Sequence, residues 1–586
     1  MARNCKEEIM TTKKILMLLL ALVMIFSLVA CGPGKDDPQK TDPSAPAATG
    51  DSTEPDSAQT EAPKAKDNIL KIGGSGYDGV FNPIMSSNVY DAYVCDLIFE
   101  ALVQLDKEGN YIPMLATWEV SEDKKTYTFT LKDGIKFSDG TPLTAEDVAF
   151  TYRTIADPKY DGPRAYAVDG MVGYDEYHKG TSAEFAGIEV KDEKTIAFTF
   201  KEAVVSNIEN FGYGILSKEY YAFGDNFDTF KELIGKPMGS GPMLLEDFAP
   251  KQHILLETNK EYWDTARVPK IDGVLISEVT EETILAALES GQIDHAQPQT
   301  NKDNLDKINE MPNVTAVPFL GNGYTFMCFE TTTPPFDQKE VRQAMLYALN
   351  RKEFIKAEYK SEELASVGMA PLSPTSWAFP DEGLNPYDFD LNKANELLDK
   401  AGWEMKEDGF RYKDGEKLTV RWLVYTESTW TQTLSGLAAD TWKQIGVDLI
   451  IDLMDFNTVA EKTMDADPAE RPKNFDVYTM GFSLSVDPDL KGALFDADAG
   501  EKGGFNASGF RDEHVQELIA KGRTTFDQAE RVKIYAELAK ILNDEVATAI
   551  VAYRYELWAV NNRVKNLDVS TYLKWTAFIH DIELTD

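Results

Sequence analysis

The sequence predicts an α/β protein with two or more lobes. Its 586 residues exceed what one hydrophobic core ordinarily holds, even after an N-terminal segment of unusual composition is set aside. Apolar and polar residues alternate in stretches between residues 126 and 200, as they do in half-buried strands. Between residues 419 and 453 the order is strand, helix and strand, which favours a βαβ unit with parallel pairing.

The first thirty residues predict a secretory signal peptide. Four basic residues precede an apolar run over residues 15–30, which only Ser27 interrupts. This run is shorter than the about 20 residues that span a membrane. It ends in Leu28-Val29-Ala30-Cys31, which resembles a lipobox, the site at which bacterial lipoproteins are cleaved and acylated. We therefore predict a signal peptide over residues 1–30 and a lipid anchor at Cys31; a signal anchor with an incidental cysteine is the alternative.

Residues 31–67 predict a disordered spacer after the anchor. Pro, Ala, Ser, Thr and Asp dominate this stretch and aromatic residues are missing from it, so it has too little apolar surface to offset the entropy of ordering. The whole chain has a net charge of −39. Such acidity favours solubility and argues against a nucleic-acid partner, which requires a clustered basic surface.

Cysteines and histidines give no metal-binding or catalytic pattern. Cys95 and Cys328 either form a disulfide, which an extracytoplasmic compartment permits, or are two buried thiols. The five histidines lack zinc-ligand spacing, and the chain has neither a P-loop nor a Gly-x-Ser-x-Gly elbow. We expect no metal ion, no cofactor and no enzymatic activity.

Local patterns predict the individual elements. A capping box at residues 144–147 predicts the start of a helix, and a second helix is expected over residues 337–351, with Asp337 as its cap. Asp390 opens a third helix that Gly402 ends. The βαβ unit consists of strand 419–425, helix 433–445 and strand 447–453. The further strands expected are 127–131, 135–137, 196–200 and 549–553, and the last helix is 531–543.

Nine short segments occur in one order along the chain, among them Gly239-Ser-Gly-Pro242 and Asp487-Pro488-Asp489. Together they resemble the extracellular solute-binding protein family 5, the oligopeptide- and dipeptide-binding proteins of ABC transporters. The resemblance covers about residues 68 to 586. The nine segments are 115–118, 127–148, 239–242, 259–263, 290–294, 335–351, 475–477, 481–482 and 487–489.

The resemblance implies a two-lobed α/β fold of the periplasmic-binding-protein type (class II, or cluster C), with an extra subdomain in the first lobe and the ligand enclosed between the lobes. The first lobe would comprise residues 68–328, the second lobe residues 329–553, and residues 554–586 would return to the first. The implied function is capture of peptides, with oligopeptides favoured, by hinge closure. The implied partners are a membrane permease with cytoplasmic ATPases, and we expect a monomer held by Cys31 on the extracytoplasmic face of the cell membrane.

Family members bind an extended peptide by strand-like hydrogen bonds, with side chains in roomy pockets. Carried over residue by residue, the resemblance implies that two glutamine amides and an aromatic wall at Phe456 contact the ligand. Phe482 stands where relatives carry Trp, with polar residues after it. Three tyrosines lie beside the places where the chain is expected to cross between the lobes. The implied ligand-binding residues are Gln297, Gln299, Tyr324, Phe456, Phe482, Ser483, Ser485, Asp487, Tyr553 and Tyr555.

The chain departs from the family at one informative position. Several relatives place an Asp a few residues after Gly-Trp, where it pairs with the ligand's α-amino group, but Leu484 or Ser485 stands there in this chain. A buried ammonium without its carboxylate costs several kcal/mol. Either Asp487 or a carboxylate from elsewhere replaces it, or the ligand is not anchored by its N-terminus. Other classes left open are a binder of oligosaccharide, nickel chelate or haem, and a sensor without transport; a surface hydrolase lacks a nucleophile constellation.

Overall fold

The computed structural model describes residues 68–585, which belong to one compact unit. The predicted signal peptide, Cys31 and the spacer lie outside the described residues. The elements packed around the hydrophobic cluster of Phe129 and Phe198 are called lobe 1, and those around the cluster of Trp422 and Trp442 are called lobe 2. No helix between residues 68 and 585 is both long and apolar enough to span a bilayer.

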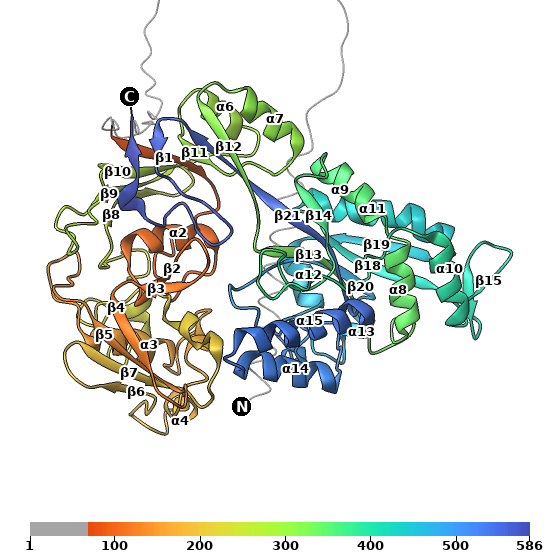
Figure 1. Ribbon diagram of the computed structural model, residues 1–586, viewed down its shortest axis with the longest axis horizontal. Coiled ribbons are helices and arrows are strands. Elements are labelled where there is room, and N and C mark those ends of the chain that lie inside the picture. Colours follow the sequence, from red (N-terminus) through yellow and green to blue (C-terminus); the bar gives the residue numbers. More distant parts are fainter. Residues whose placement is uncertain (1–67, 586) are drawn as a thin grey trace, which may run out of the picture. The chain divides into compact units, whose positions relative to one another are not determined.

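A twelve-stranded mixed sheet runs through both lobes (Figure 1). The path across the sheet is β19 (Asp448–Met454), β18 (Thr419–Tyr425), β20 (Val477–Ser483), β13 (Gly323–Phe329), β21 (Thr548–Asn561), β11 (His295–Ala296), β1 (Ile69–Gly74), β10 (Gly273–Glu278), β9 (His253–Thr258) and β8 (Met243–Ala249). Off this path, β12 (Val314–Leu320) and β14 (Ala365–Val367) both pair with β21. This mixture of sheet and helix confirms the predicted α/β class.

The 14-residue strand β21 joins the two parts of this sheet, and Figure 1 shows it passing from the lobe 2 strands to β11 and β12. Its first residues, 548–552, pair with β13, and residues 555–561 pair with β12. Because β12 and β13 follow one another in the chain, separated only by Gly321 and Asn322, a second segment passes between the lobes beside β21.

Lobe 1 also contains a separate four-stranded antiparallel sheet of β4 (Ala116–Val120), β5 (Thr126–Leu131), β7 (Thr195–Thr199) and β6 (Ile188–Val190). The strands predicted at 127–131 and 196–200 are therefore confirmed. The predicted capping box is also present, because Asp147 accepts from the Thr144 N–H at the start of α3 (Ala145–Ile155). The strand expected at 135–137 is wrong: its tight turns leave only one isolated bridge, between Lys136 and Pro142.

Lobe 1 contains further short helices and 3₁₀ segments. Those that line the site are α2 (Val89–Ile98) and the 3₁₀ segments η1 (Ala165–Ala167) and η2 (Val205–Phe211), whereas the short helix α4 (Tyr174–His178) lies outside it. Phe211 at the end of η2 packs against Phe129 and Phe198, with ring centroids 4.5 and 4.8 Å apart. This aromatic packing fixes η2 to the four-stranded sheet.

Lobe 2 contains the predicted βαβ unit. Strands β18 and β19 pair in parallel, and α11 (Thr429–Gln444) connects them. Trp422 of β18 stacks on Trp442 of α11 with ring centroids 5.3 Å apart, so helix and sheet share one core. The other lobe 2 helices are α8 (Lys339–Tyr347), α9 (Arg351–Tyr359), α10 (Leu391–Lys400), α12 (Phe456–Lys462), α14 (Glu513–Thr524) and α15 (Gln528–Glu545).

The two predicted caps in lobe 2 have different outcomes. Asp390 is the N-cap of α10 and accepts from the N–H groups of Asn392 and Lys393, and Gly402 has the positive φ expected after the helix end. Asp337 is not a cap, because it lies one position before the N-cap of α8, in a preceding turn where its own N–H bonds to the Thr333 carbonyl. Helix α8 therefore starts later, with Gln338 as its N-cap and no side-chain cap.

Candidate functional site

A cavity of about 1190 Å³, called the cleft below, is lined by residues of both lobes. Lobe 1 contributes the end of α2, η1, η2 and the hairpin of β2 (Val103–Leu105) and β3 (Tyr111–Pro113). Lobe 2 contributes the segment that follows β20, and the chain end contributes residues 572–580. A cavity with walls from two lobes is the usual place for a ligand in such a protein.

Packed glycines position the end of α2 in the cleft wall. Gly241 donates its N–H to the Ile98 carbonyl at 2.8 Å. A Cβ atom on Gly239 would lie 2.2 Å from that same oxygen, so only glycine fits there. The Gly239-Ser-Gly-Pro242 segment thus places Phe99 and Glu100 at the cleft.

The lobe 2 wall is the extended segment that continues β20. Phe482 and Leu484 are half-buried, whereas Ser483 and Ser485 are exposed, so the hydroxyl groups alternate with apolar side chains. Asn322 fixes this segment: its side-chain amide donates to the carbonyls of Leu484 and Ser485 at 2.8 and 3.2 Å. The wall is therefore held by the turn through which the chain passes between the lobes.

Exposed aromatic rings also line the cleft. Tyr166 of η1 is 54% exposed and Phe505 of lobe 2 is 47% exposed. Phe505 meets Phe482 edge to face at 5.5 Å, and the Tyr166 and Tyr213 hydroxyl groups are 2.5 Å apart. Aromatic rings left in water are apolar surface that a bound molecule can cover.

Acidic side chains outnumber basic ones in the cleft wall. Nine carboxylates line the cleft but only five arginine and lysine side chains do, so bound anions are disfavoured there. The acidic residues are Asp96, Glu100, Asp169, Glu202, Glu209, Asp487, Asp489, Asp496 and Asp498, and the basic ones are Lys201, Arg267, Lys491, Arg523 and Lys574.

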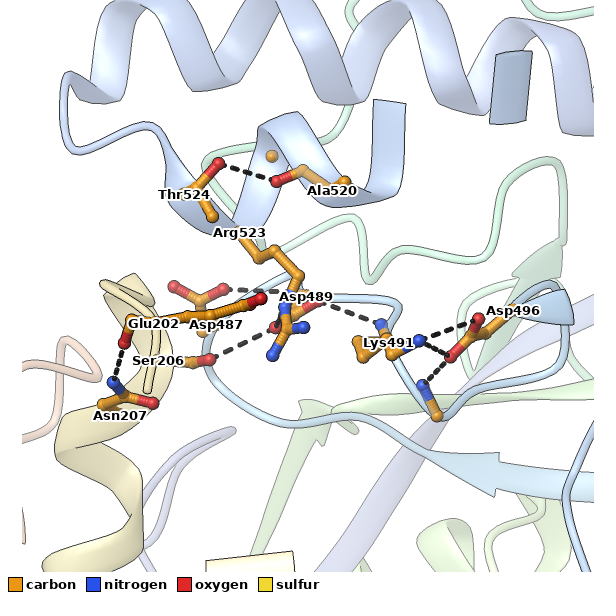
Figure 2. A network of polar contacts seen from close by, with 12 residues as sticks. Glu202, Ser206, Asn207, Asp487, Asp489, Lys491, Asp496, Ala520, Arg523 and Thr524 are labelled. Atoms are coloured by element: carbon orange, nitrogen blue, oxygen red, sulfur yellow. Dashed lines mark hydrogen bonds and ion pairs between the residues drawn. The ribbon is translucent and has the colours of Figure 1, made fainter. Parts of the chain in front are cut away.

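Arginines of lobe 2 engage the two carboxylates of the Asp487-Pro488-Asp489 segment. Arg531 of α15 donates to both oxygens of Asp487, at 2.7 and 2.9 Å. Arg523 of α14 donates to Asp489 at 3.2 Å, and the Ser206 hydroxyl of lobe 1 donates to the same oxygen at 3.2 Å (Figure 2). The charge of Asp487 is therefore compensated within the protein, before any ligand arrives.

Three cleft carboxyl groups have raised pKa values, and one of them is Asp169, whose pKa burial raises. Burial raises the pKa of Glu100 to about 7, although hydrogen bonds from Tyr262 and Trp263 oppose this rise. Burial, followed by the negative charge of Asp487, raises the pKa of Glu209 to about 8. Glu209 has no ion-pair partner among the described residues, and its recorded hydrogen bond is from the Asp487 N–H at 3.1 Å.

Of the ten ligand-binding residues expected from the sequence, the structure brings four together at the cleft: Phe482, Ser483, Ser485 and Asp487. Tyr324 is buried and stacks behind Phe482, with centroids 5.7 Å apart and an interplanar angle of 19°. It supports the wall without lining it.

The other five expected residues lie outside the cleft lining. Tyr553 is buried in lobe 2, where its hydroxyl donates to the Ala370 carbonyl at 2.6 Å. Gln297 contacts Glu556 of β21, at 3.3 Å. The other three contacts are Gln299 to Thr429 at 3.4 Å, Phe456 edge to face on Tyr425 at 5.4 Å, and Tyr555 opposite Leu320 in the sheet register.

Sequence reasoning missed Glu209, Tyr166 and Phe505. These residues stand in no recognisable motif, and they come to the cleft from segments about 40 to 340 residues apart in the chain. The reverse also occurs with Asp294, the last residue of the 290–294 segment. It pairs with Arg563 through two contacts of 2.6 Å and accepts from the Lys71 N–H, so its role is to hold the end of β21 to β1.

Cys95 and Cys328 are both buried free thiols, one in each lobe's core. Of the two alternatives, the structure therefore has the pair of buried thiols and not the disulfide. Between residues 68 and 585 no group of three or more His, Cys, Asp or Glu side chains is arranged to hold a metal ion.

Known proteins match this chain over most of its length. A model of bacterial extracellular solute-binding proteins, family 5, matches residues 110–500. Di/tripeptide-binding protein 1 of Pseudomonas aeruginosa is 27% identical over 530 residues, covering 87% of this chain and 93% of that protein. Heme-binding protein A of Haemophilus influenzae is 26% identical over 536 residues, covering 87% and 91%.

The fold is similar to that of a solved structure. The oligopeptide-binding protein AppA from Bacillus subtilis, in complex with a nonapeptide, aligns with a TM-score of 0.73 and 22% sequence identity. The alignment covers 88% of this chain and 99% of that one. The predicted two-lobed fold is thereby confirmed.

Proposed function

The chain belongs to the bacterial extracellular solute-binding proteins of family 5, and we propose that it captures peptides in the cleft for an ABC importer. The relatives include a di/tripeptide-binding protein and a structure that holds a nonapeptide, which supports a peptide ligand. A permease with cytoplasmic ATPases would receive the peptide. The protein itself would act as a monomeric receptor, without bond making or breaking.

The observation that carries this proposal is the size and lining of the cleft. Its volume of about 1190 Å³ exceeds the about 300–1,000 Å³ of small-molecule pockets, as an oligopeptide requires. Exposed aromatic rings offer apolar contact to varied side chains, and the extended segment from Phe482 to Ser485 offers polar groups to a peptide main chain.

We assign the ligand contacts accordingly. Phe482, Ser483 and Ser485 would contact the peptide directly, with Tyr324 and Tyr553 supporting the wall. Asp487 stays a proposed contact, but because Arg531 already compensates its charge, it is poorly suited to hold an α-amino group. This favours a longer peptide that is not anchored by its N-terminus. The contacts proposed for a peptide that extends beyond the cleft are Gln297, Gln299, Phe456 and Tyr555.

Capture would use a hinge motion between the lobes. A peptide that touches both walls stabilises the closed form by its preference for that form. Because β13 packs in the lobe 2 core, we propose the turn at Gly321 and Asn322 as the first lobe boundary in place of residue 328. The second proposed boundary stays at residue 553, with residues 554–586 returning to lobe 1.

Native mass spectrometry of the protein purified from its host tests the ligand class. We expect a set of bound peptides longer than three residues, which are released on denaturation. Recovery of an oligosaccharide, a nickel chelate or haem in place of peptide would contradict the proposal.

A matched pair of variants tests the cleft. Phe482→Ala removes an aromatic wall and should weaken binding of the released peptides at least tenfold in calorimetry, because burying a Phe side chain stabilises by about 1.5–3 kcal/mol. Phe389→Ala removes a ring of 40% exposure outside the cleft lining and serves as the control. Equal affinities for the two variants would place the ligand elsewhere.

We also propose that Cys31 is lipidated after removal of residues 1–30, which would hold the protein on the extracytoplasmic face of the cell membrane. This places it on the outer surface of a Gram-positive-type cell or in the periplasm otherwise. The support is the lipobox-like sequence Leu28-Val29-Ala30-Cys31 and the extracellular character of the family. Metabolic labelling with palmitate should mark the natural chain and leave Cys31→Ala unlabelled; label in the variant would disprove the assignment.

A further inference from the structure

Besides the strands that pass between them, the lobes touch at several places, and one of these lies at the cleft. There, η2 of lobe 1 faces the lobe 2 loop at residues 487–489, with α14 against it (Figure 2). Two hydrogen bonds join the lobes at this contact: the Ser206 hydroxyl donates to Asp489 at 3.2 Å, and the Asp487 N–H donates to Glu209 at 3.1 Å. Residues of both partners line the cleft, so this contact closes one of its edges.

Three carboxylates meet two guanidinium groups at this contact. Arg531 bonds to Asp487 and Arg523 bonds to Asp489, which leaves the Glu209 carboxylate without a cation. The charged and titratable groups nearest Glu209 are Tyr111 of β3, Asp487 and Asp489 of the loop and Arg531 of α15. Behind them lie Arg523 of α14, which also faces Asp169 of lobe 1, and Tyr535 of α15, which faces Arg531. An ionised Glu209 therefore adds one uncompensated negative charge where the lobes meet.

We propose that Glu209, Ser206 and the 487–489 loop form a latch that holds the lobes closed while Glu209 is protonated and weakens when it ionises. This inference rests on the proposed function only in taking the cleft as the ligand site. The latch couples closure over the ligand to the pH outside the cell membrane.

The direction of the pH effect follows from the environment of Glu209. With η2 against the loop, as in this structure, burial and the facing carboxylates raise its pKa to about 8, whereas parting the lobes would return it to water and toward its ordinary value of 4.5. Closure therefore takes up a proton between these two values. The ratio of closed to open molecules falls as pH rises in that window, by at most about tenfold per pH unit, and levels off above about pH 8.

Fluorescence energy transfer between the lobes in the full chain, without peptide, measures this ratio. Labels are placed on Lys179→Cys, after α4 of lobe 1, and Lys521→Cys, in α14 of lobe 2; both lysines are exposed, whereas Cys95 and Cys328 are buried. The latch variants are Glu209→Gln and Ser206→Ala. The control is Glu219→Gln, which neutralises an exposed carboxylate of the same lobe that lies outside the cleft lining.

We expect transfer to fall from pH 6 to pH 9 in the natural chain and in Glu219→Gln. Glu209→Gln should keep high transfer throughout, and Ser206→Ala should lower transfer at each pH while keeping the slope. A natural chain with constant transfer, or a Glu209→Gln variant with the natural slope, overturns the latch. Since no peptide is present, a failure to bind peptide would contradict the proposed function and leave this result intact.

Discussion

Asp487 and Arg531 form an ion pair that is almost removed from water, with side-chain exposures of 13% and 4%. Such a pair adds little net stability, because desolvation of both charges offsets their attraction. Removing either partner nevertheless destabilises the protein, because it leaves the other charge buried without compensation. The pair therefore fixes the cleft loop to α15.

Arg531→Met tests this dependence. It should lower the free energy of unfolding by about 3–5 kcal/mol, since it leaves Asp487 buried and unpaired. Lys533→Met on the same helix, whose partner Glu530 is exposed, should change it by less than about 0.5 kcal/mol. Urea denaturation of both variants gives the comparison, and equal effects would show that the pair carries no such role.

His295 provides a second prediction at this scale. The side chain is buried against Trp558, and its Nδ1 lies 3.1 Å from the Ala559 carbonyl; burial lowers its pKa to about 4. The folded state therefore favours the neutral ring, and stability is lost as pH falls from 6.5 to 4. The loss from this group is about 3 kcal/mol. Urea denaturation at pH 7 and pH 4 should show a smaller loss in His295→Gln; an unchanged loss would contradict the assignment.

At the scale of elements, some helix starts depend on a single side chain and others on none. Asp390 caps α10 through two backbone N–H groups, whereas Asp337 precedes α8 without capping it. Asp390→Ala should therefore destabilise the protein by about 1 kcal/mol, and Asp337→Ala by less than about 0.5 kcal/mol. Thermal unfolding of the two variants separates them, and a larger effect at Asp337 would mean that α8 begins earlier than described.

At the scale of the whole molecule, strand β21 and the β12–β13 connection leave each lobe with its own core. The lobes can therefore change their separation without disturbing either core. A ligand that bridges them binds only the folded, closed chain and raises its stability by mass action.

Peptide binding should therefore stabilise the protein by about 2.7 kcal/mol when free peptide reaches 100 times its Kd. The unfolding temperature measured by calorimetry should rise with peptide concentration in the natural chain. The rise should be smaller for Phe482→Ala at the same concentrations. A constant unfolding temperature would argue against binding in the cleft.

Local sequence determined much of this protein by itself. The βαβ unit, the capping box at Thr144 and the Asp390 cap were predictable because each depends on residues within a few positions. The family also followed from sequence, since ordered motifs retain the packing demands of one fold. Asp337 shows the limit: its residue type suits a cap, but the preceding turn to Thr333 leaves it one position before the N-cap of α8.

Only the tertiary structure decided which charges meet. Asp487 lies 44 positions before Arg531, its ion-pair partner. Glu209 lies 278 positions before Asp487, whose N–H donates a hydrogen bond to it. Pairing, burial and hence the pKa values depend on such distant neighbours, which no local pattern encodes. The sequence determined a two-lobed solute-binding chain with an N-terminal lipobox-like motif, while three-dimensional packing determined that Asp487 is already paired and that Glu209 is not.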